Sequence, residues 1–315
     1  MVDWSTVAFM FPGQGSQVVG MGKDIAEAYP VARQTFDQAD QFLGFSLSDL
    51  CFNGSSDDLS DTINTQPALY VCGIATLRAL QSEHPEAVPA FAAGHSFGEF
   101  TALAACGSLS FEDGLRLVRE RGRLMKAAGE QSPGAMAAIL SLDIEAVRDV
   151  CERARVMTGG VVVVANDNCP GQVVISGDNA TLDQALILAK EAGARRALKL
   201  AVSIASHSPL MQSSADQFRQ ALASTTFHES HIPVYGNVTA APLTDVASIR
   251  TELAAQLTSP VRWRESMDRM IADGAQTFVE VGPKDVLTGL MKRIDASKAT
   301  VNLNSVENLK TFVGD

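Results

Sequence analysis

The order of apolar and polar segments predicts a fold in which strands and helices alternate. Short apolar runs typical of buried strands occur at residues 7–11, 90–93, 233–235 and 277–281. Longer stretches with apolar residues at helical spacing predict helices at residues 30–43, 67–80, 98–105, 111–128, 209–223, 248–257, 263–272 and 285–294. Residues 53–64 are polar and are expected to form a loop. This alternation predicts an α/β protein with a parallel sheet.

The middle of the chain has a different order of predicted elements. Strands and helices are predicted there in the order β-α-β-β-α-β, at residues 135–140, 143–155, 161–165, 172–176, 179–192 and 195–200. This order is the split βαβ pattern of ferredoxin-like units. We therefore expect a large body formed by residues 1–129 and 201–315, into which a smaller ferredoxin-like subdomain is inserted at residues 130–200.

Composition narrows the class of protein. The 315 residues are 46% hydrophobic and 19% charged, which is typical of a globular chain. Lys and Arg number 25 against 36 Asp and Glu, a net charge of −11, which argues against nucleic acid and membrane surfaces as partners. We expect neither a signal peptide nor a membrane span. Five widely spaced cysteines without a CxxC pair predict no disulfide framework and no metal site, as in a cytoplasmic protein.

One motif points to nucleophilic catalysis. The sequence GHSFG at residues 94–98 fits G-x-S-x-G, and it lies between a predicted strand and a predicted helix, the context that a nucleophile elbow requires. Ser96 is then exposed beside a helix N-terminus, whose N–H groups stabilise an oxyanion. We predict that Ser96 is the nucleophile and that the body is α/β-hydrolase-like. His95 is expected to pack or cap, and Glu99 to have a structural role.

A second glycine-rich segment, FPGQGSQ at residues 11–17, follows the first predicted strand. It lacks the ending of a P-loop, and no G-x-G-x-x-G occurs in the chain. An α/β-hydrolase oxyanion hole takes one backbone N–H from the residue after the nucleophile and one from the loop after another strand. Phe97 and Gln14 are the candidates for these two donors. An ordinary tight turn is the alternative interpretation of the second segment.

Several motifs in a fixed order extend these observations over residues 9–294: FPGQGSQ, GHSFGEF, GAMAAI, PGQVVISG, SHSPLM and FVEVGPKDVLTGLMKRI. Together they resemble the malonyl-CoA:acyl-carrier-protein transacylase family, to which the acyltransferase domains of polyketide synthases are related. The resemblance implies transfer of malonyl from coenzyme A to an acyl carrier protein, through an acyl-serine, in fatty acid or polyketide synthesis. It implies no bound cofactor, because the substrates themselves carry phosphopantetheine.

The resemblance also implies roles for individual residues. Ser96 corresponds to the acylated serine, His207 to its general base and Arg121 to the partner of the malonyl carboxylate. Supporting roles fall to the oxyanion donors Gln14 and Phe97, to the backbone carbonyl of Gln256, which orients the histidine, and to the pocket residues Asn166 and Asn168. Histidine suits the activation of a weak nucleophile, and arginine offers a planar fork for a carboxylate.

Alternatives stay open at this stage. The segment Ile204-Ala205-Ser206 before His207 departs from the His-Ala-Phe-His pattern of malonyl-selecting synthase domains, so another extender such as methylmalonyl is possible. An acyl-thioester hydrolase would share the serine and the histidine. A catalytically silent docking module is disfavoured by the three intact site residues. Without the resemblance, residues 166–168 fit a turn. Carrier proteins are usually acidic, so we also expect a local basic patch.

Overall fold

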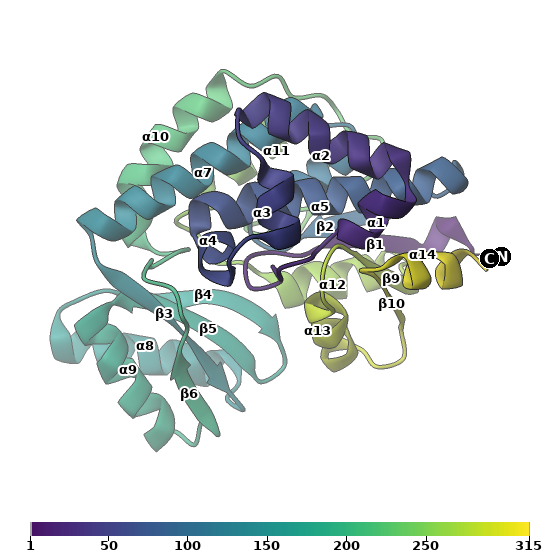
Figure 1. The fold of residues 1–315 in the computed structure, drawn as a ribbon. Coiled ribbons are helices and arrows are strands. Elements are labelled where there is room, and N and C mark those ends of the chain that lie inside the picture. Colours follow the sequence, from purple (N-terminus) through teal and green to yellow (C-terminus); the bar gives the residue numbers. More distant parts are fainter. Residues whose placement is uncertain (1, 315) are drawn as a thin grey trace.

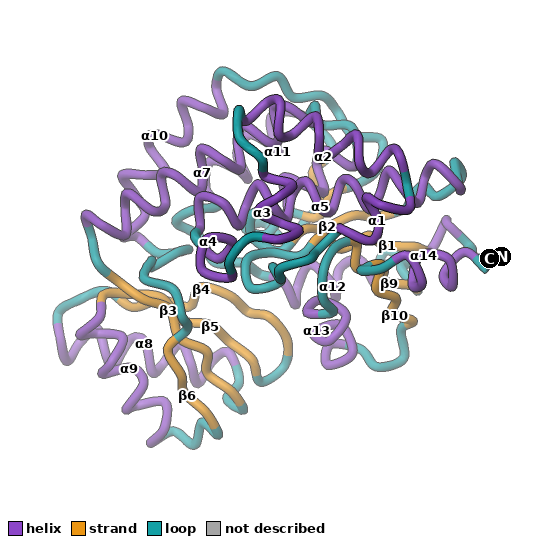
Figure 2. Tube along the Cα trace, in the orientation of Figure 1, coloured by secondary structure: helices purple, strands orange, loops and turns teal. Residues whose placement is uncertain are grey.

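The computed structural model describes residues 2–314, and its larger sheet forms the centre of the body (Figures 1 and 2). The strand order is β10-β9-β1-β2-β7-β8. The strands are β1 (Val7–Phe11), β2 (Phe91–Gly94), β7 (Val234–Tyr235), β8 (Pro242–Leu243), β9 (Thr277–Val281) and β10 (Ala299–Leu303). All neighbours pair in parallel except β7 and β8. The predicted α/β class with a parallel sheet is confirmed.

Helices cover both faces of this sheet. They are α1 (Lys23–Ala28), α2 (Pro30–Leu43), α3 (Leu47–Asn53), α4 (Ser56–Ser60), α5 (Thr62–Glu83), α6 (Gly98–Ala105), α7 (Phe111–Gln131), α10 (Gln212–Ala223), α11 (Val246–Ala255), α12 (Trp263–Ala272), α13 (Val286–Ile294) and α14 (Val306–Val313). Alternate side chains of a strand face opposite layers. Phe9 and Phe11 of β1 accordingly pack in the core that contains α2, α5 and α7, whereas Met10 packs in the core that contains α12 and α13.

The second sheet is antiparallel and lies to one side of the body (Figure 1). Its order is β4-β5-β3-β6, with strands β3 (Gly134–Leu140), β4 (Val162–Cys169), β5 (Gln172–Asp178) and β6 (Arg196–Lys199). Helices α8 (Ile144–Thr158) and α9 (Asn179–Glu191) bury an apolar core against it. The element order along the chain is β-α-β-β-α-β. The division of the chain into domains at residues 129/130 and 200/201 stays a prediction.

The loop predicted at residues 53–64 is wrong. This segment contains α4, and α5 begins at Thr62 rather than at Pro67. Ser55 and Asp61 cap these two helices, because their side chains accept hydrogen bonds from the N–H groups of the following turns. The polar composition therefore reflects two helix starts. No helix among residues 2–314 is both long and apolar enough to cross a membrane.

The turn between β2 and α6 is unusually tight. A Cβ atom on Gly94 would lie 1.9 Å from the carbonyl carbon of Gly98, and one on Gly98 would lie 2.4 Å from the backbone oxygen of Phe11. Ser96, between them, has a left-handed backbone with φ 54°. Only glycine fits at both flanking positions, so the spacing of the G-x-S-x-G motif follows from backbone packing.

We predict that Gly98→Ala lowers the free energy of unfolding by about 2 kcal/mol or more, because the new methyl group would overlap the β1 backbone. Urea unfolding measures this change. Gly289→Ala is the matched control, since a Cβ there meets nothing within 4 Å in helix α13. It should be neutral or stabilise by up to about 1 kcal/mol. Equal effects of the two substitutions would contradict the packing argument.

Candidate active site

A cavity of about 260 Å³ lies between the two sheets, at the carboxyl edge of the parallel sheet. The loops after β1 and β2, helices α7 and α13, and the face of the small sheet away from its helices line it. Seven of the eight predicted site residues line this cavity: Gln14, Ser96, Phe97, Arg121, Asn166, Asn168 and His207. The eighth, Gln256, lies directly behind them and contacts Ser96, Arg121 and His207.

Ser96 and His207 form a hydrogen-bonded pair. The Oγ of Ser96 lies 2.9 Å from Nε2 of His207. The other ring nitrogen, Nδ1, lies 2.9 Å from the backbone oxygen of Gln256 and 3.1 Å from that of Ser259. Two carbonyl acceptors require a proton on Nδ1, so in the neutral ring Nε2 is free to accept the proton of Ser96.

The environment keeps His207 neutral. Burial and, second, the positive charge of Arg121 lower the pKa of His207 to about 3, although the backbone oxygen of Gln256 opposes this shift. A neutral imidazole is the form that can act as a base. The backbone of His207 is left-handed, with φ 58°, as is that of Ser96. Both members of the pair are thus held in a conformation that side-chain-bearing residues rarely adopt.

Arg121 places a buried guanidinium beside the serine. Its side chain is 1% exposed, and Nη2 donates to Ser96 Oγ over 3.2 Å. Nε donates to Gln256 Oε1 and Nη1 to Gln66 Oε1, each over 3.1 Å. Among residues 2–314, no carboxylate lies within ion-pair distance of Arg121. Burial lowers the pKa of Arg121 to about 9, although Glu99 opposes this shift, so the guanidinium is a cation at neutral pH whose direct hydrogen-bond acceptors are neutral groups.

The two candidate oxyanion donors are backbone N–H groups of residues that line the cavity. Phe97 precedes α6, and Gln14 lies in the loop after β1. Strands β1 and β2 are neighbours, with Phe11 opposite Gly94, so their following loops meet at the same edge of the sheet. Within the described chain, no acceptor is assigned to the N–H of either Gln14 or Phe97. Both groups are therefore available to a ligand in the cavity.

The side chain of Gln256 has more contacts than the sequence suggested. Its Nε2 donates to the backbone oxygen of Ser96 over 3.0 Å and to Glu99, while its Oε1 accepts from Arg121. Glu99 is fully buried, and burial together with the nearby Glu252 raises its pKa well above the usual range. Glu99 thus has the structural role that was expected, as support for Gln256. Sequence reasoning missed the amide of Gln256 and also Gln66, which no motif marks.

Strand β4 carries the two pocket asparagines. Asn168 Oδ1 lies 2.8 Å from Nε2 of His95, whose ring packs edge-on against Trp263. Asn166 forms a β-bridge with Val261 of the body, and β4 continues to Cys169. The turn interpretation of residues 166–168 is therefore wrong. The pairing of Asn166 with Val261 extends β4 beyond its apolar part. The contact between Asn168 and His95 joins the small sheet to the turn that carries Ser96.

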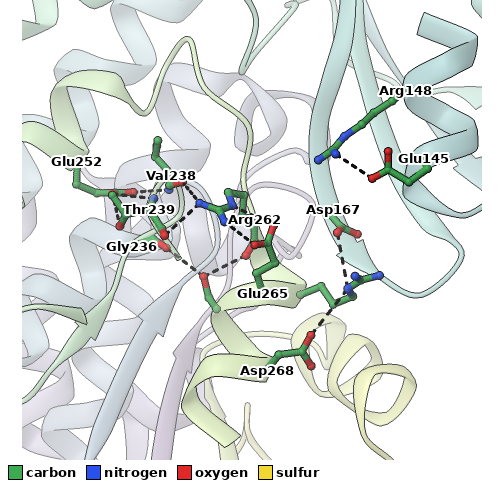
Figure 3. Close-up of polar contacts among 12 residues, drawn as sticks. Glu145, Arg148, Asp167, Gly236, Val238, Thr239, Glu252, Arg262, Glu265 and Asp268 are labelled. Carbon is green, nitrogen blue, oxygen red and sulfur yellow. Dashed lines mark hydrogen bonds and ion pairs between the residues drawn. The ribbon is translucent and has the colours of Figure 1, made fainter. Parts of the chain in front are cut away.

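A basic groove lies at one end of the small sheet, and we define it by Arg195, Arg196 and Arg293. Arg293 donates to Gln172 Oε1 and to the backbone oxygen of Pro170. Neither Arg195 nor Arg196 has a carboxylate partner among the described residues. Other basic residues have carboxylate partners: Lys199 pairs with Asp183, and Arg264 lies near Asp167 and Asp268. Arg262 pairs with Glu265 (Figure 3).

Comparison with known proteins agrees with this geometry. The family model described as "Acyl transferase domain" matches residues 8–310. Malonyl CoA-acyl carrier protein transacylase of Bacillus subtilis (strain 168) is 44% identical over 309 residues, which are 98% of this chain and 96% of the relative. The enzyme of the same name from Escherichia coli (strain K12) is 45% identical over 287 residues, covering 91% and 92% of the two chains.

Solved structures agree as well. A crystal structure of an acyl carrier protein S-malonyltransferase from Vibrio cholerae has a TM-score of 0.94 and 43% identity, and the match covers 98% of this chain and 99% of that one. A malonyl-transacylase solved in complex with its type II polyketide synthase acyl-carrier protein has a TM-score of 0.94 and 39% identity, with 98% and 99% covered. The chain belongs to the acyl transferase domain family and, within it, to the malonyl-CoA:acyl-carrier-protein transacylases.

Proposed function

We propose that this protein transfers a malonyl group from malonyl-CoA to the phosphopantetheine thiol of an acyl carrier protein, through an ester on Ser96. One observation carries the proposal. Arg121 is a buried cation without a carboxylate partner in the described chain, and it lies 3.2 Å from the Oγ of Ser96. A buried charge without a counterion is costly, so the site favours an acyl group that brings its own carboxylate. The names of the relatives agree with this substrate.

The first half-reaction forms the acyl-serine. His207 Nε2 takes the hydroxyl proton as Ser96 Oγ attacks the thioester carbonyl carbon. Negative charge then develops on the carbonyl oxygen, where the N–H groups of Gln14 and Phe97 stabilise it. The intermediate collapses with cleavage of the C–S bond, and the coenzyme A sulfur leaves with the proton from His207. The oxygens of Gln256 and Ser259 stabilise the imidazolium while it exists.

The second half-reaction reverses this chemistry with a different thiol. His207 accepts the thiol proton of the carrier protein as the sulfur attacks the ester carbonyl carbon. The C–O bond to Ser96 breaks, and Oγ regains the proton. The two acyl carriers end in the same phosphopantetheine thiol, so one serine can serve both. We assign no cofactor to the protein beyond the phosphopantetheine that its substrates carry.

Arg121 also couples the choice of acyl group to the basicity of His207. Its charge is one cause of the lowered pKa of His207, so a bound malonyl carboxylate would offset that charge and make the imidazole more basic. An acetyl group would leave the guanidinium unpaired and the histidine weakly basic. Both effects favour a dicarboxylic acyl group over a neutral one.

The basic groove is our candidate for part of the carrier-protein docking surface. The chain as a whole carries a net charge of −11, yet Arg195, Arg196 and Arg293 gather at one end of the small sheet. Opposite charges on two partners steer their encounter.

The product would supply extender units for fatty acid or polyketide synthesis, and we place the reaction in the cytoplasm because all five cysteines are free.

Intact-mass spectrometry after mixing with malonyl-CoA tests the proposed function. The protein should gain the mass of one malonyl group, and subsequent addition of holo acyl carrier protein should remove it. Ser96→Ala should show no adduct, since the nucleophile is absent. Ser206→Ala is the control, because this serine also lines the cavity without contacting His207 Nε2. An adduct on Ser96→Ala would refute the assignment of the nucleophile.

Arg121→Ala should lower kcat/KM for malonyl-CoA by about 100-fold or more without lowering that for acetyl-CoA, because only malonyl uses the guanidinium and because its removal ends the lowering of the His207 pKa by this charge. Steady-state transfer to holo carrier protein with each donor measures the ratio. Arg123→Ala is the control on the same helix, where the side chain is exposed and pairs with Glu120. An equal loss for both donors would contradict the carboxylate role.

Charge reversal in the basic groove (Arg195→Glu, Arg196→Glu and Arg293→Glu together) should raise the KM for the carrier protein by about 10-fold at low ionic strength. The rate of acylation by malonyl-CoA should stay the same. Arg33→Glu on the distant helix α2 reverses an exposed arginine outside the groove and serves as control. An unchanged KM in the triple variant would remove the groove from the docking surface.

A further inference from the structure

One asparagine side chain joins the two arms of the nucleophile turn. Asn237 Oδ1 accepts from the backbone N–H of Ser96 over 2.7 Å, and its Nδ2 donates to the backbone oxygen of Gly94 over 2.8 Å. A flipped amide would set donor against donor and acceptor against acceptor, so the two bonds fix its orientation. The side chain supplies hydrogen bonds at a turn whose backbone, with Ser96 at φ 54°, departs from regular structure.

The fold explains why residue 237 can reach this turn. Strand β7 pairs in parallel with β2, with Ala92 opposite Val234 and Ala93 opposite Tyr235. Both strands end at the same edge of the sheet, so the segment after β7 lies beside the segment after β2. Asn237 is 2% exposed. Water is therefore largely excluded from its two hydrogen bonds, which makes their loss more costly.

Hydrogen bonds with two charged side chains fix the segment that carries Asn237, residues 236–239. The buried carboxylate of Glu252 accepts from the N–H groups of Val238 and Thr239. The guanidinium of Arg262 donates to the backbone oxygens of the same two residues and pairs with Glu265 (Figure 3). Glu252 thus binds the N–H groups of residues 238 and 239, and Arg262 binds their carbonyl oxygens.

Asn237 itself is fixed through its backbone. Its N–H donates to Glu99 Oε1 over 3.3 Å, and its carbonyl oxygen accepts from the N–H of Arg262 over 2.8 Å. The same Glu99 accepts from the side chain of Gln256, so one buried carboxyl contacts both residues whose amides bind the backbone of Ser96: Asn237 through its backbone N–H and Gln256 through its side chain. Both amides are consequently placed by the interior rather than by flexible surface groups.

The two amides act on different peptide planes. Asn237 holds the N–H of the peptide that precedes Ser96, and Gln256 Nε2 holds the carbonyl oxygen of the peptide that follows it. The peptide that follows Ser96 is trans, so the N–H of Phe97 points away from that carbonyl oxygen, and Phe97 is one of the residues that line the cavity. The direction of this oxyanion donor therefore depends on the backbone dihedrals of Ser96.

We propose that Asn237 is a positioning residue that keeps Ser96 in its left-handed conformation, so that Oγ stays on His207 and the Phe97 N–H stays aimed at the oxyanion. The proposal rests on the proposed function for its acyl chemistry. Removal of the amide leaves the N–H of Ser96 without its buried partner and lets the strained turn relax. The consequence is a slower chemical step, while the acyl-donor pocket and Arg121 are unchanged.

The test compares Asn237→Ala and Asn237→Asp with the parent protein. We expect kcat to fall by about 10- to 100-fold with KM for malonyl-CoA within about 3-fold, because misaligned oxyanion donors act on the transition state. Asn237→Asp keeps the size and an acceptor for the Ser96 N–H but sets a carboxylate against the Gly94 oxygen, so it should not rescue activity. Circular dichroism and thermal unfolding establish that each variant is folded.

Thr239→Val is the matched control. It removes a hydrogen bond to Glu252 from the same segment without touching Gly94 or Ser96, so its kcat should stay within about 2-fold of the parent. A folded Asn237→Ala with parental kcat, or a control that loses as much, would overturn the proposal. Loss of folding in both Asn237 variants would assign the residue to stability and would also overturn it.

A second readout separates this proposal from the proposed function. An activated fluorophosphonate reacts with a nucleophilic serine and develops charge on its phosphoryl oxygen, whichever acyl group is the natural substrate. The rate of Ser96 labelling should fall by about 10-fold or more in Asn237→Ala and stay parental in Thr239→Val. If the parent protein labels but forms no malonyl adduct, the proposed function fails and the positioning role stands. Equal labelling of all three proteins would end the positioning role alone.

Discussion

The guanidinium of Arg121 is a full positive charge in the interior, and the surroundings stabilise it without neutralising it. Gln66 and Gln256 accept from two of its nitrogens, and the sulfur of Met125 lies 3.1 Å from Nη1. Neutral acceptors offset part of the desolvation cost and leave the charge itself uncompensated. The remaining direction, through Nη2, points at Ser96. This uncompensated charge is the basis on which we propose selectivity for an acyl group with a carboxylate.

The same region holds two strained residues. Ser96 and His207 both have a left-handed backbone, and their side chains meet over 2.9 Å. Such strain persists only where the surroundings over-determine the conformation. Gly94 and Gly98 provide the space, and the amides of Asn237 and Gln256 hold the backbone on either side of the serine. Buried amides therefore hold the backbone on both sides of the proposed nucleophile.

The small sheet completes the cavity and is fastened to the body at its strand β4. Asn166 pairs with Val261, and the N–H of Asp167 donates to the Val261 oxygen. Asn168 then reaches His95, the neighbour of the nucleophile. The open face of the sheet contributes apolar wall residues such as Met136 and Val174, which suit the mostly uncharged length of a phosphopantetheine arm. Apolar residues of α13, such as Leu287 and Leu290, also line the cavity.

Sequence by itself determined the local part of this arrangement. The strand, the tight turn and the helix around Ser96 follow one another within a few consecutive residues. Glycine is the only residue that fits at the two flanking positions, 94 and 98. Only the family resemblance predicts Arg121, and it is the structure that separates this residue from Arg119 and Arg123, since Arg121 shares the buried stripe of α7 with Leu117, Leu124 and Met125. The polar segment at 53–64 misled the prediction because helix caps and loops use the same residues. Only the tertiary structure decided that Asn237 and the amide of Gln256 bind the backbone of Ser96 and that Gln66 binds Arg121, because a lone amide has no periodicity or motif. Its role depends on which strands become neighbours, and that is settled by packing between segments far apart in the chain.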